Sequence, residues 1–430
     1  MTSEKPGRIR WVLIIWIFIM SSVSYCDRVN ISIASHYLER EFHFSDMQLG
    51  YIFSAFLVGY ALFQAPGGRI ADRYGPRRGI TAYMAWFAVF VALVTAIPHS
   101  MASALVAFAV VRFLLGSGEA VLFPGSNRLV AKWIPSNERG LANGLIFAGV
   151  GAGAGMSPPL VTFIMLHGGW RLSFWLNGLV GLVVGAVWFL LARDKPEDHP
   201  WVKPPELALI RAGLPDSGRS SKGILPWRTI LGSKDFLLIT WSYFCYGYTS
   251  YIFFAWFFRY LTTVRGLSLR EGSYLTPLPF IAMAFCSPTG GLVSDFVTRH
   301  YGKRWGRCGI AVLGIALCGV FMACGHAVPS PRLASVVLAA AAGSLFFSQS
   351  TYWSVTADIA GESAGSVSGI MNMGGQFGGA LTATLTPLIA HTQGLGWGVA
   401  FGVAAFLCAS GALAWLRVDP NRKLTPPAAA

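Results

Sequence analysis

Twelve mostly apolar stretches, each long enough to cross a lipid bilayer as a helix, dominate this sequence. They lie at roughly 11–36, 47–69, 79–97, 101–124, 141–166, 171–192, 235–261, 273–294, 308–326, 332–357, 365–390 and 395–416. A helix that spans the hydrocarbon core needs about 20 such residues. The sequence therefore predicts an all-α integral membrane protein with 12 transmembrane helices.

The composition excludes the soluble alternatives. Hydrophobic residues make up 54% of the 430 residues and charged residues only 12%, whereas soluble proteins contain about 25% charged residues. A disordered chain would need low hydrophobicity and many charges. The seven cysteines lie in apolar stretches without CxxC spacing, so we expect neither a disulfide framework nor a metal site.

The distribution of Lys and Arg predicts the orientation in the membrane. With the N-terminus in the cytoplasm, 25 of the 33 basic residues fall on the cytoplasmic side and 6 on the opposite side, in line with the positive-inside rule. Both termini are then cytoplasmic, and the net charge of +14 needs no nucleic-acid partner. The apolar run after Arg10 continues past any plausible signal-peptidase site, so we do not expect the start of the chain to be a cleaved signal peptide. We expect a multi-pass protein of a bacterial inner membrane.

One long polar stretch divides the chain. Residues 193–234 separate an N-terminal bundle of six helices (1–192) from a C-terminal bundle of six (235–416). Within this linker, residues 203–212 are expected to form a short amphipathic helix that lies on the membrane face or bridges the halves. The tail, 417–430, is expected to be disordered.

The two halves repeat each other. At an offset of 223 residues, Tyr51, Gly67, Gly68 and Asp72 coincide with Tyr274, Gly290, Gly291 and Asp295. Parallel six-helix repeats are typical of secondary transporters that rock two halves around a central site. Glycines allow close helix approach, Asp72 can cap a helix start, and the arginines can pair with acids across the halves. We interpret Asp72, Arg73, Arg77 and Asp295 as a gating latch; the alternative is a loop that merely anchors its helices.

The run GGRIADRYGPRR at 67–78, with its weaker copy after the eighth segment, resembles the signature loop of the major facilitator superfamily. Finer features resemble its anion:cation symporter family, which includes proton-coupled sugar-acid carriers. These features are YCDRVNISIA at 25–34, GYALFQAPGG at 59–68, RFLLGSGEAVLFPGSNRLVAKWIP at 112–135, FFAWFFRYLT at 253–262 and SGIMN at 368–372. The resemblance covers almost the whole chain. It implies two pseudo-symmetric six-helix bundles that alternate access to one site.

Four ionisable residues lie well inside the predicted helices: Asp27 and Arg28 in the first, Arg112 and Glu119 in the fourth. Such charges are costly near the bilayer centre, so they face one another or a cavity. Arg112 and Glu119 share one helix face, about 10 Å apart. An arginine is a permanent anion site, and a substrate anion that competes with an acid for it favours protonation of that acid. This competition is a route to symport; the alternative is two structural salt bridges.

The resemblance assigns roles to these residues. Asp27 and Glu119 match the proton carriers of the sugar-acid branch, Arg28 matches the contact of the substrate carboxylate, and Arg112 matches the partner of the acids. Further substrate-site candidates are Tyr60, Gln64, Ser350, Trp353 and Asn372. By resemblance all but Gln64 line the substrate pocket. Each, taken singly, can equally be a hydrogen bond between helices.

One residue departs from the resemblance. Val150 stands where a glutamine of the fifth helix bonds substrate hydroxyls in galactonate-type carriers, and an apolar side chain cannot do so. This favours a less hydroxylated or aromatic carboxylate. In the seventh helix, Tyr248 and Tyr251 could close over a substrate, although aromatic stripes are more often core. Asp358 and Glu362 are expected to pair with basic loop residues.

We therefore predict proton-coupled uptake of an organic anion, most simply a sugar acid or related carboxylate, by a monomer in the lipid bilayer without a cofactor. The alternatives are exchange or export of organic anions, uptake of an aromatic or dicarboxylic acid, and an anion sensor that does not transport. An enzyme is not expected, because the sequence has no metal-binding cluster and no P-loop.

Overall fold

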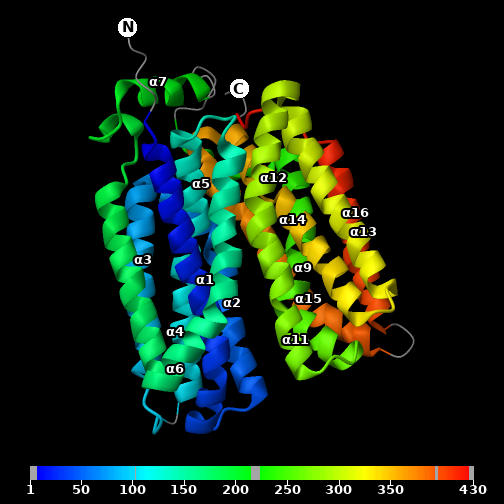
Figure 1. The fold of residues 1–430 in the computed structure, drawn as a ribbon. Coiled ribbons are helices and arrows are strands. Elements are labelled where there is room, and N and C mark those ends of the chain that lie inside the picture. Colours follow the sequence, from blue (N-terminus) through cyan, green and yellow to red (C-terminus); the bar gives the residue numbers. More distant parts are fainter. Residues whose placement is uncertain (1–6, 102, 215–222, 393–395, 426–430) are drawn as a thin grey trace.

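The helices form two bundles that stand side by side, and both chain termini lie at the same end of the molecule (Figure 1). The structure is a computed structural model that describes residues 7–101, 103–214, 223–392 and 396–425. Within these residues all the regular structure is helical. We call the end that carries the termini the terminal end, and the other the opposite end.

The first bundle contains the predicted helices of the N-terminal half. Its elements are α1 (Ile9–Phe42), α2 (Asp46–Tyr74), α3 (Pro76–Thr95), α4 (Ala104–Glu119), α5 (Leu122–Trp133) and α6 (Arg139–Leu191). α4 and α5 together make one span that is interrupted after Glu119, because Pro124 has no N–H to bond the carbonyl of Ala120. α6 contains two spans that meet at Gly169, whose φ of 77° only glycine adopts without strain.

The linker holds η1 (Pro196–Asp198), α7 (Pro204–Gly213) and α8 (Trp227–Leu231). α7 lies over the terminal end of the first bundle (Figure 1). The fully buried Glu206 of α7 accepts the N–H groups of Ile9 and Arg10 at 3.3 and 3.1 Å and so caps the start of α1. The expected short helix is present, and its buried carboxylate fastens it to the start of α1; that it lies on the membrane or bridges the halves stays a prediction.

The second bundle has more breaks. Its elements are α9 (Lys234–Ala255), α10 (Phe257–Arg259), η3 (Tyr260–Val264), α11 (Leu269–Leu275), α12 (Pro277–Lys303), η4 (Arg304–Gly309), α13 (Ile310–Ala327), α14 (Pro331–Ala360), η5 (Gly361–Ser363), α15 (Ala364–His391) and α16 (Gly396–Leu416). Gly302 near the end of α12 and Gly75 after α2 have φ of 83° and 86°. Each repeated loop therefore turns on a glycine with positive φ, three residues after Asp72 in the first half and seven after Asp295 in the second.

Eight helical stretches among the described residues are apolar and long enough to cross a membrane. Three of them (Arg139–Leu191, Pro277–Ala327 and Pro331–Ala390) each hold two of the predicted segments. α9, which begins with the charged residues Lys234 and Asp235, provides the remaining predicted span. At the terminal end, α2 and α12 run on to Tyr74 and Lys303, beyond the apolar stretches that predicted them.

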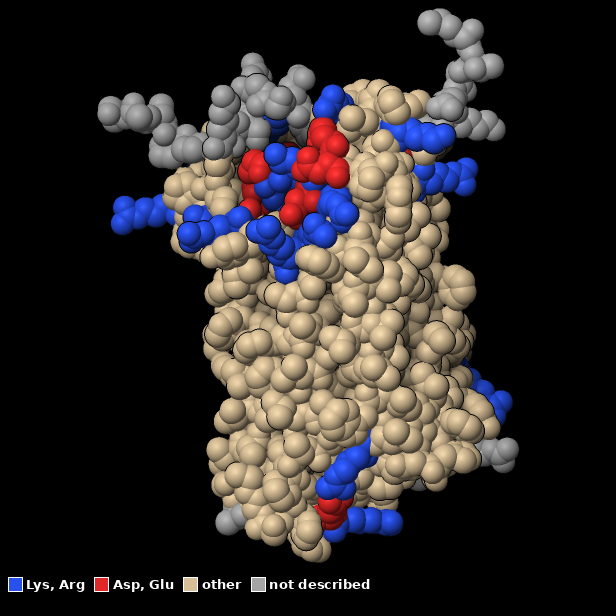
Figure 2. Space-filling model, turned by 90° about the vertical axis from the view of Figure 1, so that its left-hand side faces the viewer, with Lys and Arg blue, Asp and Glu red and all other residues tan. Residues whose placement is uncertain are grey.

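The charged side chains follow the pattern of a membrane protein. On the face drawn in Figure 2 they gather at the terminal end, with a few more at the opposite end and a broad band of other residues between. Large hydrophobic side chains such as Phe163, Leu190 and Phe285 are exposed, as expected where lipid rather than water is the solvent. The chain is a multi-pass membrane protein.

The prediction of a disordered tail is wrong for residues 417–425. The backbone N–H of Asp419 donates to Asp235, at 3.1 Å, and that of Leu424 donates to the carbonyl of Ile359, at 3.0 Å. Arg422 forms an ion pair with the same Asp235 at 3.2 Å, and Val418 is fully buried. These contacts hold the segment against the start of α9 and the end of α14. Residues 426–430 lie outside the described residues.

Candidate functional site

A cavity of about 590 Å³ lies between the two bundles, a size usual for small-molecule sites. Its wall includes Ala255, the last residue of α9, and Thr276, directly before α12, which both lie toward the opposite end. Towards the terminal end the wall reaches Tyr60 of α2 and Asn372 of α15. The cavity therefore extends from the middle of the bundles towards the opposite end.

Rings make up much of this wall. The aromatic lining residues are Tyr25, Phe53, Phe56, Tyr60, Phe123, Phe147, Tyr243, Tyr246, Tyr251, Phe254, Phe280 and Phe346. The other polar lining residues are Arg28, Ser32, Arg112, Ser250, Thr276, Gln349, Asn372 and Gln376. Both arginines come from the first bundle, so the positive charge of the wall is confined to one side.

Arg28 of α1 pairs with Glu119, the last residue of α4. Its Nε and Nη2 atoms donate to Glu119 Oε1 at 3.0 and 2.6 Å. The guanidinium also lies over the rings of Tyr25 and Tyr60, 4.4 and 4.3 Å from their centroids. The aromatic faces hold the cation in place. Arg28 lines the cavity, whereas Glu119 is fully buried behind it.

A second pair lies beside the first. Arg112 Nη1 donates to Asp27 Oδ2 at 2.9 Å, and both side chains are buried. Arg112 and Glu119 stand about two helical turns apart on α4, which gives room for both α1–α4 pairs on one face. Arg112 also belongs to the cavity wall, while Asp27 does not. Each arginine thus stands between a buried carboxylate and the cavity.

Two polar contacts, one between the bundles and one within the second bundle, lie beside the cavity on its terminal side. Asn372 of α15 donates to Gln64 of α2 at 2.9 Å, and Trp353 Nε1 donates to the hydroxyl of Tyr243 at 3.1 Å. The indole of Trp353 also packs on Phe123 and Phe147. Of the predicted substrate residues, Tyr60 and Asn372 line the wall, and Gln64 and Trp353 support lining residues from behind.

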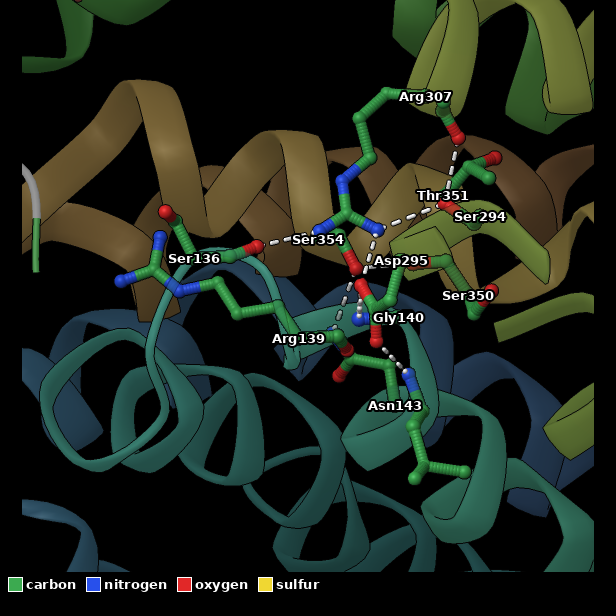
Figure 3. Close-up of polar contacts among 12 residues, drawn as sticks. Ser136, Arg139, Gly140, Asn143, Ser294, Asp295, Arg307, Ser350, Thr351 and Ser354 are labelled. Atoms are coloured by element: carbon green, nitrogen blue, oxygen red, sulfur yellow. Dashed lines mark hydrogen bonds and ion pairs between the residues drawn. The ribbon is translucent and has the colours of Figure 1, made fainter. Parts of the chain in front are cut away.

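Ser350 is a correction. It is fully buried on α14 and does not line the cavity formed by the described residues. Its carbonyl accepts the hydroxyl of Ser354 at 2.7 Å (Figure 3). Its neighbour Gln349 takes the place in the wall, because successive helix residues point about 100° apart. Gln349 was not identified from the sequence.

The aromatic stripe of α9 also needs a correction. Tyr251 lines the cavity and donates to Gln376 at 2.7 Å, whereas Tyr248 is buried away from the wall. Tyr243 and Tyr246, which also line the cavity, were not identified as site residues. The i, i+3, i+4 spacing of Tyr243, Tyr246 and Gly247 was the signal that could have found them.

At the terminal end, each repeat of the signature loop caps a helix of the other bundle. Asp72 of α2 accepts the N–H groups of Gly365 and Ser366 at 2.9 and 2.6 Å, at the start of α15. Asp295 of α12 accepts those of Gly140 and Leu141 at 2.9 and 2.7 Å, at the start of α6. A carboxylate is stabilising at such a helix start. The two contacts are equivalent under the internal repeat.

Two glycines make these contacts possible. A Cβ on Gly68 would lie 2.1 Å from the carbonyl oxygen of Gly365, and one on Gly291 would lie 2.2 Å from that of Gly140. No side chain fits at either position without moving the backbones apart. The helices of the two bundles therefore touch through their main chains at the terminal end.

Arginines reinforce both contacts, although not the predicted ones. Arg307 pairs with Asp295 at 2.8 Å, and also reaches Ser294 and the carbonyl of Ser136 (Figure 3). Arg139 pairs with Asp358 of the other bundle at 2.5 Å. Arg128 pairs across the bundles with Glu362 and lies 3.6 Å from Asp72. Asp358 and Glu362 thus have the basic partners expected of them.

Arg73 and Arg77 do not belong to this cross-bundle contact in the described part of the chain. Arg77 donates from its main chain to Asp194 and from its side chain to Phe189, both in the first bundle and its linker. Arg73 lies against the ring of Tyr74. Their loop turns outwards at Gly75, so the arginines that face the other bundle come from α5, α6 and η4 instead.

Residues 361–365, GESAG, match the GxSxG pattern of lipase nucleophiles. The pattern needs a strand before the serine and a helix after it, but here it joins two helices, α14 and α15. The hydroxyl of Ser363 accepts the N–H of Leu225 from the linker. Among the described residues, no three His, Cys, Asp or Glu side chains group together to hold a metal ion.

Comparison with known proteins identifies the family. The sequence profile of the Major Facilitator Superfamily matches residues 17–383. The chain belongs to this superfamily. It is 30% identical to a probable sulfoacetate transporter of Cupriavidus necator, covering 94% of this chain and 92% of that protein. It is 29% identical to a hexuronate transporter of Bacillus subtilis, covering 94% and 93%.

The fold agrees with a solved member of the superfamily. The structure of the proton:xylose symporter XylE superimposes with a TM-score of 0.76, covering 98% of both chains at 14% identity. The resemblance to the anion:cation symporter type is confirmed by the curated relatives, at about 30% identity. The chain is thus a secondary transporter and not an enzyme.

Proposed function

We propose that this protein imports an organic anion into the cytoplasm together with protons. The observation that carries the proposal is the order of charges at the cavity: Arg28 and Arg112 line it, and Glu119 and Asp27 are buried behind them. Relatives named as sulfoacetate and hexuronate transporters carry anions of the same class. Transport across the membrane then couples to the protonation of the two carboxylates.

Coupling follows from competition for Arg28. Glu119 Oε1 takes two of the guanidinium hydrogen bonds of Arg28. A substrate carboxylate that binds Arg28 bidentately displaces Glu119 from these donors. A buried carboxylate that loses its cation is costly unless it takes up a proton. Anion and proton therefore bind together, which is the thermodynamic basis of symport. Asp27 and Arg112 form the second exchangeable pair.

Alternating access is provided by the two bundles as rocking bodies. The contacts of Asp72 and Asp295 close the terminal end, while the cavity extends towards the opposite end. With the termini in the cytoplasm, as the basic residues predict, this is the outward-facing state that accepts substrate. Import requires these contacts to break as new ones form at the opposite end.

Uptake into proteoliposomes tests the proposal. Radiolabelled organic acids are offered with an inward proton gradient and, separately, in counterflow without one. The wild type should accumulate an acid only with the gradient. Glu119→Gln has the shape of a permanently protonated glutamate, so it should retain counterflow and lose accumulation. Gradient-driven accumulation by this variant at the wild-type level would remove Glu119 from the coupling step, and exchange without any effect of the gradient would indicate an antiporter.

A further inference from the structure

The second bundle contributes an uncharged, aromatic wall to the cavity. Tyr243 and Tyr246 of α9 stack in parallel with centroids 5.1 Å apart, and Phe254 and Phe280 lie 5.1 Å apart further towards the opposite end. None of the described lining residues of this bundle is Lys or Arg. A substrate bound to Arg28 therefore meets rings, not charges, on its far side.

Several amides and hydroxyls of the cavity wall already have partners within the protein. Asn372 donates to Gln64, Gln376 accepts from Tyr251, and Val150 contributes no polar atom at all. A sugar acid carries a hydroxyl on nearly every carbon, and each loses its hydrogen bonds to water on entry. Unmatched hydroxyls cost affinity because a buried polar group without a partner is unfavourable.

Two polar atoms on the second bundle's side of the wall are buried without a partner in the described part of the chain. The hydroxyl of Tyr246 and the Oε1 atom of Gln349 have no hydrogen-bond partner among the described residues. Both side chains are more than nine-tenths buried, with exposed fractions of 4% and 3%. The other end of the Gln349 amide donates to Tyr243 at 3.1 Å, so this side chain is held in position. Orphaned groups of this kind in a cavity wall indicate a ligand group that completes them.

We propose that the substrate is a hydroxylated aromatic monocarboxylate, which deepens and rests on the proposed anion transport. Its carboxylate binds Arg28 on the first bundle. Its ring packs among the aromatic side chains, where ring pairs contribute beyond the area they bury. Its single hydroxyl donates to Gln349 and accepts from Tyr246 on the second bundle. A ligand with one charged and one polar end joins the two bundles.

Binding to the purified protein in detergent, without any gradient, tests this substrate class. Titration calorimetry compares 4-hydroxybenzoate, benzoate, D-galactonate and sulfoacetate. We expect 4-hydroxybenzoate to bind at least tenfold more tightly than D-galactonate or sulfoacetate, and several-fold more tightly than benzoate. Tyr246→Phe and Gln349→Met each remove one polar group at nearly constant volume. Each should bring the ratio of the Kd values of benzoate and 4-hydroxybenzoate close to one.

The outcomes separate this inference from the proposed function. Tighter binding of D-galactonate or sulfoacetate than of both aromatic acids overturns it, as does a hydroxyl preference that survives both substitutions. Whether the substrate is aromatic is decided by the affinities of the four acids for the wild-type protein alone, so a variant that misfolds does not affect this conclusion. Val150→Gln is a gain-of-affinity test: it should strengthen D-galactonate binding. If 4-hydroxybenzoate binds most tightly but its uptake does not depend on the proton gradient, the proposed substrate class is supported and the proposed proton coupling is refuted.

Discussion

Replacing Asp72 with asparagine should open the terminal end. The carboxylate accepts the N–H groups of Gly365 and Ser366 and the hydroxyl of Ser366 at 2.9, 2.6 and 2.5 Å. Asparagine keeps one oxygen acceptor, loses the charge and turns an NH₂ group towards these donors. Hydrogen bonds to a charged group contribute about 1.5–3 kcal/mol, and a charge at a helix start about 0.3–2 kcal/mol.

These contributions exist only while the terminal end is closed. Their loss therefore shifts the equilibrium towards the open form by about 2–3 kcal/mol, which is roughly a 30- to 150-fold change in the population ratio. The equivalent Asp295→Asn acts on an independent contact, so the double variant should shift the equilibrium by about twice that free energy.

Spin–spin distances measure the effect. Tyr74 and Tyr301 are exposed near the terminal ends of α2 and α12, and labelled cysteines at these positions report the separation of the bundles. The exposed Cys324 is replaced by serine in this background. A longer distance should appear in the Asp72→Asn protein and dominate in the double variant.

Asp194→Asn is the matched control. Asp194 accepts the main-chain N–H of Arg77 at 3.0 Å within one half of the molecule, so the same change of charge should leave the distance distribution unaltered. A double variant whose distances coincide with those of the wild type would refute the argument that helix capping holds this end closed.

Three further predictions concern other parts of the chain. Arg28→Lys should weaken anion binding at least tenfold in calorimetry, because an ammonium cannot bond a carboxylate bidentately. Equal affinities of the variant and the wild type would exclude bidentate binding by Arg28. Glu206→Gln should lower the free energy of unfolding by about 1–3 kcal/mol, measured by thermal unfolding. Glu197 forms an exposed pair with Arg211, so Glu197→Gln should have little effect. Equal effects of the two substitutions would contradict the capping role of Glu206. Burial and the charge of Arg193 lower the pKa of His199 below its ordinary value of 6.5. The neutral form therefore stabilises the linker above pH 6.5, and this stabilisation is lost as the pH falls through the lowered pKa. An NMR titration, assigned with His199→Gln, should show the lowered pKa, and a pKa above 6.5 would contradict the argument.

The sequence predicted the spans and the four charges because both depend on local patterns. Apolar length specifies a span, and a seven-residue spacing on a helix puts Arg112 and Glu119 on one face. It did not predict that both arginines line the cavity with both acids behind them, since that depends on how α1 and α4 rotate against each other. The prediction that Ser350 lines the site was wrong for the same reason. Gln349, one residue earlier on α14, lines the cavity, whereas Ser350 is buried in the interior.

The terminal end shows the limit of motif reasoning. Asp72 and Asp295 were identified because the motif repeats, and both cap a helix of the other bundle; that they act as a gating latch stays a prediction. Arg73 and Arg77 were included because they are neighbours in sequence, yet Gly75 turns their loop away from the other bundle. Arg128 and Arg139, which pair with acids of the other bundle, come from segments with no repeated signal, so only the three-dimensional packing reveals them.

The four charges of the two α1–α4 ion pairs also bear on how membrane voltage acts on the carrier. Asp27 and Glu119 cancel Arg28 and Arg112, so these four groups of the empty carrier sum to zero. A monovalent anion that enters with one proton leaves that sum at zero, and neither reorientation step then moves charge through the electric field. A potential of 100 mV, worth about 2.3 kcal/mol per elementary charge, would leave such transport unchanged. A second proton, one for each acid, would make the loaded form positive and let the interior-negative potential drive uptake.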